Sequence, residues 1–205
     1  MTISCNNNNL LWSHTAAILA GGESKRMGTP KEGIPLWDSR PMIEHIVNTI
    51  SIITKKIVIV GECKGYSPTK DIKIIPDFEP HRGPLIGLKS LLKSNLDSAY
   101  LVIACDQPLI TKELLQLLIQ EESQHIKLFT GEKLEARIDP FPGYYPTSCL
   151  KNLQNMIEIG NSSMQAFLKS SKIDWIKIPE DQKHLLRSIN TPQDLEEVKN
   201  EFAYR

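Results

Sequence analysis

The chain has 205 residues, a length that suits one domain with a sizeable core, and 40% of them are hydrophobic and 23% charged, as in ordinary globular proteins. This composition excludes a disordered or collagen-like chain. Lys plus Arg and Asp plus Glu each total 24, so the formal net charge is zero, and no overall positive field exists that would hold nucleic acid or an anionic membrane. Any site for an anion must therefore be local.

Four cysteines are scattered without a CxxC pair or a neighbouring group of histidines that would complete a zinc site: Cys5, Cys63, Cys105 and Cys149. We expect reduced thiols. No apolar run approaches the roughly 20 residues of a membrane span, and the start of the chain lacks the basic and apolar regions of a signal peptide. We therefore predict a cytoplasmic protein with no membrane or nucleic-acid partner, with 1–13 as a flexible tail and 14–205 as a single domain.

Short apolar runs alternate with helical patterns between residues 15 and 120. Four runs rich in apolar, often β-branched residues predict strands that are buried on both faces: 15–20, 55–60, 71–76 and 98–104. Three segments space their apolar residues three and four apart, as helices that cover a sheet do: 41–53, 84–94 and 111–120. This order predicts an α/β domain with a mostly parallel sheet, whose ligands gather beyond the carboxyl ends of the strands.

The pattern weakens after Thr130. The segment FPGYYP (141–146) interrupts it, 147–159 and 162–170 have the spacing of helices, and 173–179 predicts a strand. A final helix is predicted over 191–202, because Thr191 suits its N-cap and Pro192 suits its first turn.

The first predicted strand runs into the stretch LAGGESKRMGTPK, which extends from Leu19 to Lys31. Gly21 and Gly22 permit positive φ and let backbone N–H groups approach a ligand closely, as in phosphate-binding loops. Arg26 can make forked contacts to phosphate oxygens, and Lys31 can supply a mobile positive charge. Neither a GxGxxG spacing nor a GK[ST] ending is present, which disfavours a dinucleotide site or an NTPase P-loop. On these residues alone, a glycine turn with solvated basic side chains is an equal alternative.

Four motifs, in order, resemble the signatures of the MobA-like nucleotidyltransferases. LAGGESKRMGTPK is similar to the family's LAGGxSxRMGxxK, PDFEPHRGPLIGL to its Asp-then-GPLxGL segment, YLVIACDQPLI to its CDxP, and SINTPQDL to its NTPxDL. The double glycine and GPLxGL are typical of the MobA-like branch, whereas AG is common among the cytidylyltransferases. The resemblance implies a three-layer Rossmann-like α/β fold and the transfer of GMP from GTP to the terminal phosphate of molybdopterin, with release of pyrophosphate.

The resemblance also implies which residues bind the nucleotide. Arg26 and Lys31 would offset the charge that builds on the phosphates, since alignment and charge neutralisation are the main demands of the reaction. The backbone of four consecutive residues would cradle the nucleotide: Leu19, Ala20, Gly21 and Gly22.

Two carboxylates at predicted strand ends are candidates for the metal and nucleotide sites. Asp106 is the one best placed to bind Mg²⁺, which prefers oxygen ligands, although by itself it also suits a turn-capping Asp before Pro108. Asp77 is expected to contact the nucleotide, and Gly83 to let the backbone lie against the base or ribose. The alternatives are a turn at Asp77 and a helix start at Gly83 and Pro84, and the two roles are compatible.

Asn190 in NTP and Tyr144 in FPGYYP are expected on the acceptor side of the site, and for Tyr144 a buried β-segment is an equal alternative. Two positions depart from the family pattern. Ser188 stands where the family often has the first Asn of NxNTP, so no metal or pterin role is assigned to it. Gly61 stands where some members carry an Asn that reads the base, so guanine choice is not assigned to this position.

The sequence therefore predicts a Mg²⁺-dependent nucleotidyltransferase with Arg26, Lys31 and Asp106 as its catalytic residues. GTP and molybdopterin are the expected substrates, and proteins of molybdoenzyme maturation are expected as further partners. A related enzyme that uses CTP with the same acceptor would keep the phosphate-binding residues and differ only in its base contacts. A non-catalytic scaffold that binds nucleotide or cofactor is the other alternative, and the three charged residues argue against it.

Overall fold

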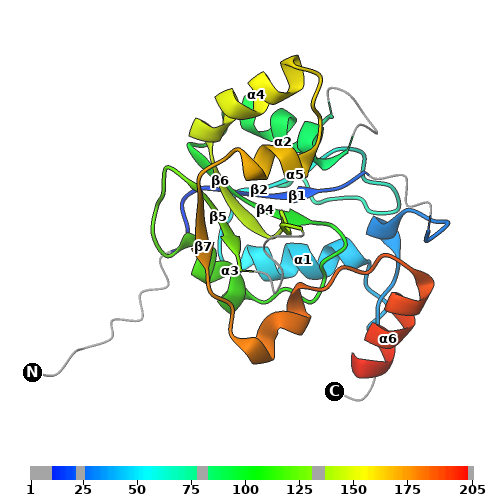
Figure 1. Ribbon diagram of the computed structural model, residues 1–205. Helices are drawn as coiled ribbons and strands as arrows, with labels where there is room; N and C mark the ends of the chain where they lie inside the picture. Colours follow the sequence, from blue (N-terminus) through cyan, green and yellow to red (C-terminus); the bar gives the residue numbers. More distant parts are fainter. Residues whose placement is uncertain (1–10, 22–25, 78–82, 131–136, 203–205) are drawn as a thin grey trace, which may run out of the picture.

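The protein is described here from a computed structural model, which describes residues 11–21, 26–77, 83–130 and 137–202. Within these residues seven strands form one sheet, in the order β3-β2-β1-β4-β6-β5-β7 (Figure 1). The strands are β1 (Thr15–Leu19), β2 (Ile57–Val60), β3 (Lys73–Ile75), β4 (Ala99–Ala104), β5 (Ile126–Phe129), β6 (Gly143–Pro146) and β7 (Ile173–Ile176). β6 is antiparallel to both of its neighbours, and the other adjacent pairs are parallel. The predicted fold class is confirmed.

Helices cover both faces of the sheet, which gives the molecule three layers (Figure 1). One face is covered by α1 (Met42–Ser51) and α3 (Lys112–Ile119), and the other by α2 (Pro84–Lys93), α4 (Leu150–Glu158) and α5 (Met164–Lys169). The last helix, α6 (Pro192–Phe202), lies beside one end of this sandwich. Short 3₁₀ helices complete the described elements: η1 (Lys31–Gly33), η2 (Thr147–Cys149) and η3 (Glu180–Leu186).

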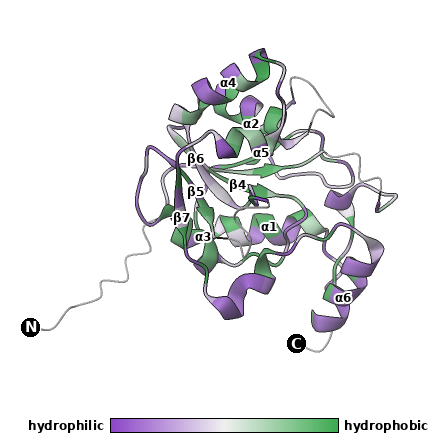
Figure 2. Cartoon of the chain, in the orientation of Figure 1, coloured by the Kyte–Doolittle hydropathy of each residue, from purple (hydrophilic) through white to green (hydrophobic). Residues whose placement is uncertain are grey.

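Successive side chains of β1 point to opposite faces of the sheet and belong to two hydrophobic clusters, one on each face. Ala16 and Ile18 pack with α1 and α3, whereas Ala17 and Leu19 pack with α2, α4 and α5. Figure 2 shows the result, with hydrophobic strands in the middle layer and hydrophilic residues along α6. Burial on both faces explains why these parallel strands appear in the sequence as continuous apolar runs.

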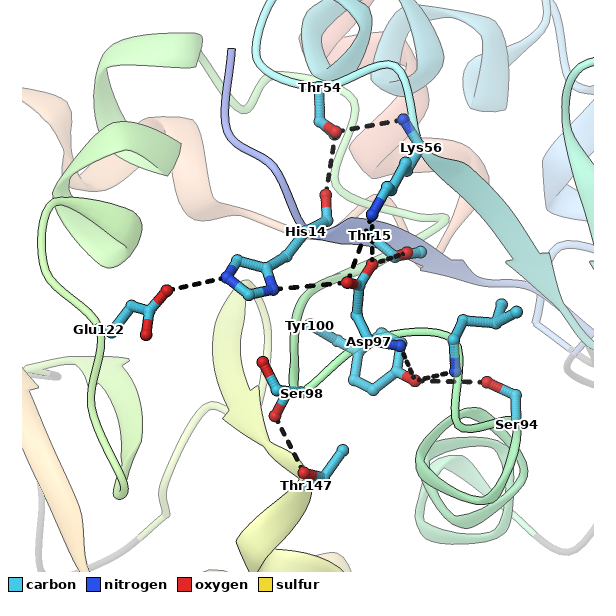
Figure 3. Close-up of polar contacts among 11 residues, drawn as sticks. His14, Thr15, Thr54, Lys56, Ser94, Asp97, Ser98, Tyr100, Glu122 and Thr147 are labelled. Carbon is cyan, nitrogen blue, oxygen red and sulfur yellow. Dashed lines mark hydrogen bonds and ion pairs between the residues drawn. The ribbon is translucent and has the colours of Figure 1, made fainter. Parts of the chain in front are cut away.

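A polar cluster ties together the amino-terminal ends of β1, β2 and β4 (Figure 3). The Asp97 carboxylate accepts a hydrogen bond from Thr15 Oγ1 at 2.5 Å and lies 3.4 Å from Lys56 Nζ. His14 lies between two acidic residues, with Nδ1 3.5 Å from Asp97 Oδ1 and Nε2 3.0 Å from Glu122 Oε1. The cluster thus links the amino-terminal ends of these three strands through polar side chains.

The predicted helices over 41–53, 84–94 and 111–120 are confirmed as α1, α2 and α3. The predicted final helix is confirmed as α6, which begins at Pro192. Prediction was incomplete in the last third of the sheet. FPGYYP, which was expected to interrupt the pattern, contains strand β6, and β5 was not predicted.

Part of the predicted N-terminal tail, residues 11–13, lies within the described ranges. The Trp12 N–H donates a hydrogen bond to the Ile53 carbonyl at 2.8 Å, and the Trp12 side chain packs against the core. The division of the chain at residue 13 stays a prediction. No helix in the described ranges is both long and apolar enough to span a bilayer.

Candidate active site

A cleft of about 410 Å³ opens at the carboxyl ends of β1, β2, β3 and β4. The chain passes from β1 outward to β2 and β3 and then returns to β4 on the other side of β1. The strand order therefore reverses between β1 and β4, which is where open α/β sheets bind ligands. The walls contain most of the residues that the sequence indicated: Leu19, Ala20, Gly21, Arg26, Lys31, Asp77, Gly83, Asp106 and Asn190.

Lys31 is the centre of the polar contacts in this cleft. It belongs to η1, and its Nζ donates to Asn190 Oδ1 at 2.8 Å and to Asp106 Oδ2 at 3.2 Å. The Asn190 amide oxygen also accepts a hydrogen bond from Arg26 Nη2 at 3.2 Å. The three predicted catalytic residues and Asn190 are thus connected, although they come from three distant parts of the chain.

Asp106 has the features of a ligand for a hard cation. Its Oδ2 accepts from Lys31, whereas its buried Oδ1 has no hydrogen-bond partner within the described residues. Mg²⁺ is commonly held by one or two carboxylates, with substrate phosphates and water as the remaining ligands. The described ranges contain no cluster of three or more His, Cys, Asp or Glu residues that could hold a metal ion alone. This donor set fits a cation that is bound together with a nucleotide.

Asn190 is held by the start of α6. Asp194 Oδ2 accepts hydrogen bonds from the N–H groups of Asn190 and Thr191, both at 2.8 Å, while Thr191 Oγ1 accepts from the Asp194 N–H at 3.2 Å. This reciprocal pair is a capping box. The hydrogen bond from the Asn190 N–H is the main cause that lowers the pKa of Asp194 below its usual value. In addition, the Ile189 N–H donates to the Asp106 carbonyl at 2.8 Å, which joins this segment to the end of β4.

The backbone at the end of β1 differs from the expected phosphate cradle. The Ala20 N–H donates to the Val60 carbonyl at 2.9 Å, and the Gly21 N–H donates to Glu32 Oε1 at 2.8 Å. These two donors already have partners in the protein, so they do not point to a ligand in this conformation. Gly22, the remaining glycine of the predicted cradle, lies outside the described residues.

Gly61 lies close to the same backbone. Its φ is +95°, and a Cβ built there would lie 2.3 Å from the Ala20 carbonyl oxygen. Because any larger residue would collide with the end of β1, this conformation requires glycine. The absence of a base-reading Asn at this position therefore has a steric reason.

Asp77 and Gly83 lie in the wall beside α2. Asp77 Oδ1 accepts a hydrogen bond from Ser90 Oγ at 3.0 Å, which orients the carboxylate. Gly83 is the N-cap of α2 with φ +86°, and Pro84 is the first helical residue. The expected helix start at Gly83 is confirmed, and it coexists with a place in the cleft wall.

Cys105 lies in the cleft wall next to Asp106. Burial raises the pKa of its thiol well above the usual value, and the charges of Asp106 and Glu32 act in the same direction. The thiol is therefore protonated at neutral pH and is not suited to be a nucleophile. Cys63 and Cys149 are also free, whereas Cys5 lies outside the described residues.

Tyr144 does not lie in the wall of the cleft. It is 2% exposed within β6, and its hydroxyl donates to the Ser123 carbonyl at 3.3 Å. The alternative, a buried β-segment, is the one that the structure has. The aromatic residue in the cleft wall is instead Phe141, whose carbonyl accepts a hydrogen bond from the buried Gln107 side chain at 2.8 Å.

Sequence reasoning did not indicate Phe141, Gln107 or Glu32. Gln107 Nε2 also donates to the Leu186 carbonyl at 3.1 Å, so one side chain joins three segments behind the cleft. Gln107 occupies the variable position of the CDxP motif. Its hydrogen-bond partners are distant in the sequence, so no local sequence pattern predicts this role. Glu32 follows Lys31 directly, and a Glu next to Lys in a loop reads as a solvated charge.

The Rossmann-like fold, with a basic and carboxylate-lined cleft at its topological switch point, defines a class of nucleotide-dependent transferases. Residues 16–175 match the profile of a family described as MobA-like NTP transferase domain. The chain belongs to this family, which confirms the resemblance and identifies the protein as a nucleotidyltransferase.

Relatives of similar length support this assignment. A probable molybdenum cofactor guanylyltransferase of Flavobacterium johnsoniae is 32% identical over 186 residues, which cover 90% of this chain and 95% of the relative. Another, from Carboxydothermus hydrogenoformans, is 27% identical and covers 93% of this chain and 98% of the relative.

The fold is similar to that of solved structures in this family and in neighbouring ones. Molybdopterin-guanine dinucleotide biosynthesis protein A from Archaeoglobus fulgidus has a TM-score of 0.75 at 20% identity, over 94% of this chain and 100% of that chain. The 2-C-methyl-D-erythritol 4-phosphate cytidylyltransferase from Thermus thermophilus has a TM-score of 0.62 at 13% identity, over 90% and 97%. The fold is thus shared by enzymes whose names indicate different bases and acceptors.

Proposed function

We propose that the protein transfers GMP from GTP to molybdopterin, forming molybdopterin guanine dinucleotide and releasing pyrophosphate. The observation that carries this proposal is the joint contact of Lys31 with Asp106 and Asn190 in a cleft large enough for a nucleotide. The names of the Flavobacterium and Carboxydothermus relatives support GTP as the donor and the molybdenum cofactor as the acceptor.

The reaction is a displacement at the α-phosphorus of the nucleotide. An oxygen of the terminal phosphate of molybdopterin forms a bond to this phosphorus, and the bond from the phosphorus to the oxygen that bridges to the β-phosphate breaks. The electron pair leaves with pyrophosphate. Because a phosphate nucleophile is already ionised near neutral pH, no general base is required, and charge neutralisation and alignment are the main tasks of the protein.

Lys31 and Arg26 supply the positive charge of the protein in this step. Both side chains donate to the same Asn190 amide oxygen, so their charged ends converge on one part of the cleft. Their ammonium and guanidinium groups would face the phosphates of the nucleotide and offset the charge that develops during transfer. Asn190, held by the capping box at the start of α6, keeps the two cations together.

Asp106 would hold Mg²⁺ through the oxygen that has no partner within the described residues. The ion would supply charge neutralisation at the triphosphate. Asp77 would contact the nucleotide, and Gly83 would let the backbone approach the base or ribose. As part of this proposal, we also infer a cytoplasmic protein that passes its product to molybdoenzyme maturation proteins.

The test is an incubation of the purified protein with Mg²⁺, molybdopterin and each of the four NTPs, in which pyrophosphate and the dinucleotide are both measured. GTP should give both products, and omission of Mg²⁺ or molybdopterin should abolish them. Turnover with CTP alone would indicate a cytidylyl transferase with the same phosphate chemistry. Tight nucleotide binding without release of pyrophosphate would indicate a non-catalytic scaffold.

A further inference from the structure

Glu32 is a buried carboxylate in the wall of a cleft that is proposed to bind phosphates. It is 2% exposed, and its Oε1 accepts the hydrogen bond from the Gly21 N–H at 2.8 Å. Within the described residues it forms no ion pair, because the neighbouring Lys31 is directed to Asp106 and Asn190. Burial of a carboxylate without an ion-pair partner reduces the stability of the fold, and its negative charge would repel an anionic ligand. A specific structural role of Glu32 would explain why a buried carboxylate is present in this wall.

The turn that carries Glu32 is fixed to the rest of the domain. A Cβ on Gly33 would lie 2.8 Å from the Gly65 carbonyl oxygen, so the backbone of η1 packs directly against a second loop. At its end, the Ile34 N–H donates to the Lys31 carbonyl and the Met42 N–H donates to the Ile34 carbonyl, which joins η1 to α1. Glu32 therefore extends from a rigid support.

Gly21, by contrast, is the second residue beyond β1 and has a φ of +83°. Its N–H lies outside the strand, and Glu32 is the partner that the structure gives it. Loss of this acceptor would leave the Gly21 N–H unsatisfied and free the backbone of Gly21 to move.

We propose that Glu32 is a positioning residue, which fixes Gly21 and thereby the end of β1 relative to Lys31. The same short turn directs Lys31 toward Asp106 and Asn190 and Glu32 toward Gly21, so it links these two walls of the cleft. The inference rests on the proposed nucleotidyl transfer for its kinetic measurement, whereas its binding measurement requires only a nucleotide site.

Two substitutions of similar size separate the hydrogen bond from the charge. Glu32→Gln keeps an oxygen that can accept from the Gly21 N–H but removes the negative charge, whereas Glu32→Met removes both. Glu32→Asp, one methylene shorter, keeps the charge but does not reach Gly21 without a shift of the turn. Glu158→Gln, at an exposed position on α4, controls for general loss of a carboxylate.

The variants are compared in pyrophosphate release with GTP and molybdopterin, and in binding of a fluorescent GTP analogue with Mg²⁺. We expect Glu32→Met to lower kcat by about tenfold or more, equivalent to about 1.4 kcal/mol in the barrier. Glu32→Gln should keep kcat within about threefold of the parent and bind the analogue more tightly, because a like charge is removed. Glu32→Asp should resemble Glu32→Met in kcat, which keeps the comparison decisive if the Met variant does not fold.

Equal kcat losses in the Gln and Met variants, with both folded, would overturn the proposal, and so would a folded Met variant with unchanged kcat. If the parent protein turns over no NTP, the proposed function fails separately. In that case the binding measurement tests the positioning role. Binding of the GTP analogue by Glu32→Gln but not by Glu32→Met supports this role, whereas equal affinities of the two variants contradict it.

Discussion

Lys31 Nζ lies 3.2 Å from Asp106 Oδ2, while the other oxygen of the same carboxylate is buried and has no partner within the described residues. One carboxylate thus contacts the ammonium group of Lys31 through one oxygen and keeps the other without a hydrogen-bond partner in the described part of the chain. The side chains of Lys31 and Asp106 are 14% and 19% exposed, so the pair is accessible from the cleft without being fully solvated. This relationship is the basis for the first two predictions.

Asp106→Asn should leave folding intact and remove most Mg²⁺-dependent turnover, by about tenfold or more. An amide is a weaker ligand than a carboxylate for a hard cation, but its oxygen can still accept the hydrogen bond from Lys31 Nζ, which preserves this contact in the fold. Initial rates over a Mg²⁺ titration, together with urea unfolding, measure both effects. Near-normal turnover of the variant at limiting Mg²⁺ would show that Asp106 does not hold the ion.

Lys31→Ala should lower the transfer rate more than it weakens GTP binding. If the ammonium faces charge that develops on the transferring and leaving phosphates, its loss affects the transition state more than the bound substrate. Single-turnover rates and equilibrium binding of GTP separate the two quantities. Lys172→Ala, which removes an exposed lysine next to β7, is the control and should change neither. Equal losses in affinity and in transfer efficiency would instead make Lys31 a residue for ground-state binding.

The capping box at α6 predicts a pH-dependent contribution to stability. The pKa of Asp194 is lowered in the folded protein, so its ionised form stabilises the fold above the unfolded pKa of about 3.9, and this stabilisation is lost as the pH falls through the lower folded value. Asp194→Asn should therefore cost about 1 kcal/mol at pH 7, and less below about pH 4. Urea unfolding at both pH values tests this, with the exposed Glu196→Gln as the control. A cost that does not change with pH would refute the role of the charge.

Gly61→Ala should destabilise the protein more than Gly160→Ala does. Both glycines have positive φ, +95° and +80°, but a Cβ at Gly160 meets no atom within 4 Å, whereas one at Gly61 lies 2.3 Å from the Ala20 oxygen. Gly160→Ala should cost about 1–2 kcal/mol for backbone strain alone, and Gly61→Ala about 1–3 kcal/mol more because of the collision. Thermal unfolding of both variants provides the comparison. Equal costs would indicate that the end of β1 yields to the added methyl group.

The sequence was sufficient for the first half of the sheet because β1, β2 and β4 are buried on both faces and are therefore continuously apolar. It was insufficient for β5 and β6. β5 contains Lys127, which is 6% exposed and donates to the Glu121 carbonyl, so the strand does not read as an apolar run. β6 begins at Gly143, where a Cβ would lie 2.6 Å from Leu128 Cδ2. Here glycine permits close packing between strands, although in the sequence it reads as a break.

The residues of the candidate site were also predictable only in part. Arg26, Lys31, Asp106 and Asn190 were predicted from motifs, and the structure brings them into contact. Glu32 was not predicted, because its contact with Gly21 depends on how η1 folds back against the end of β1, which no local pattern records. Residues that belong to sequence motifs were thus easier to find than a residue whose contact depends on the tertiary structure.

The base that the protein transfers is the most direct test of its proposed function. A site whose buried polar groups match guanine should reject other bases, because each unpaired group would cost about 1–3 kcal/mol. Gly61 has no side chain to contribute, so we expect the backbone of Leu19 and the segment from Asp77 to Gly83 to supply this selectivity. The decisive measurement is competitive turnover with equimolar GTP and CTP, Mg²⁺ and molybdopterin, with the two dinucleotides quantified by mass spectrometry. The proposed function predicts that the guanine dinucleotide predominates, and preferential transfer of CMP would contradict it.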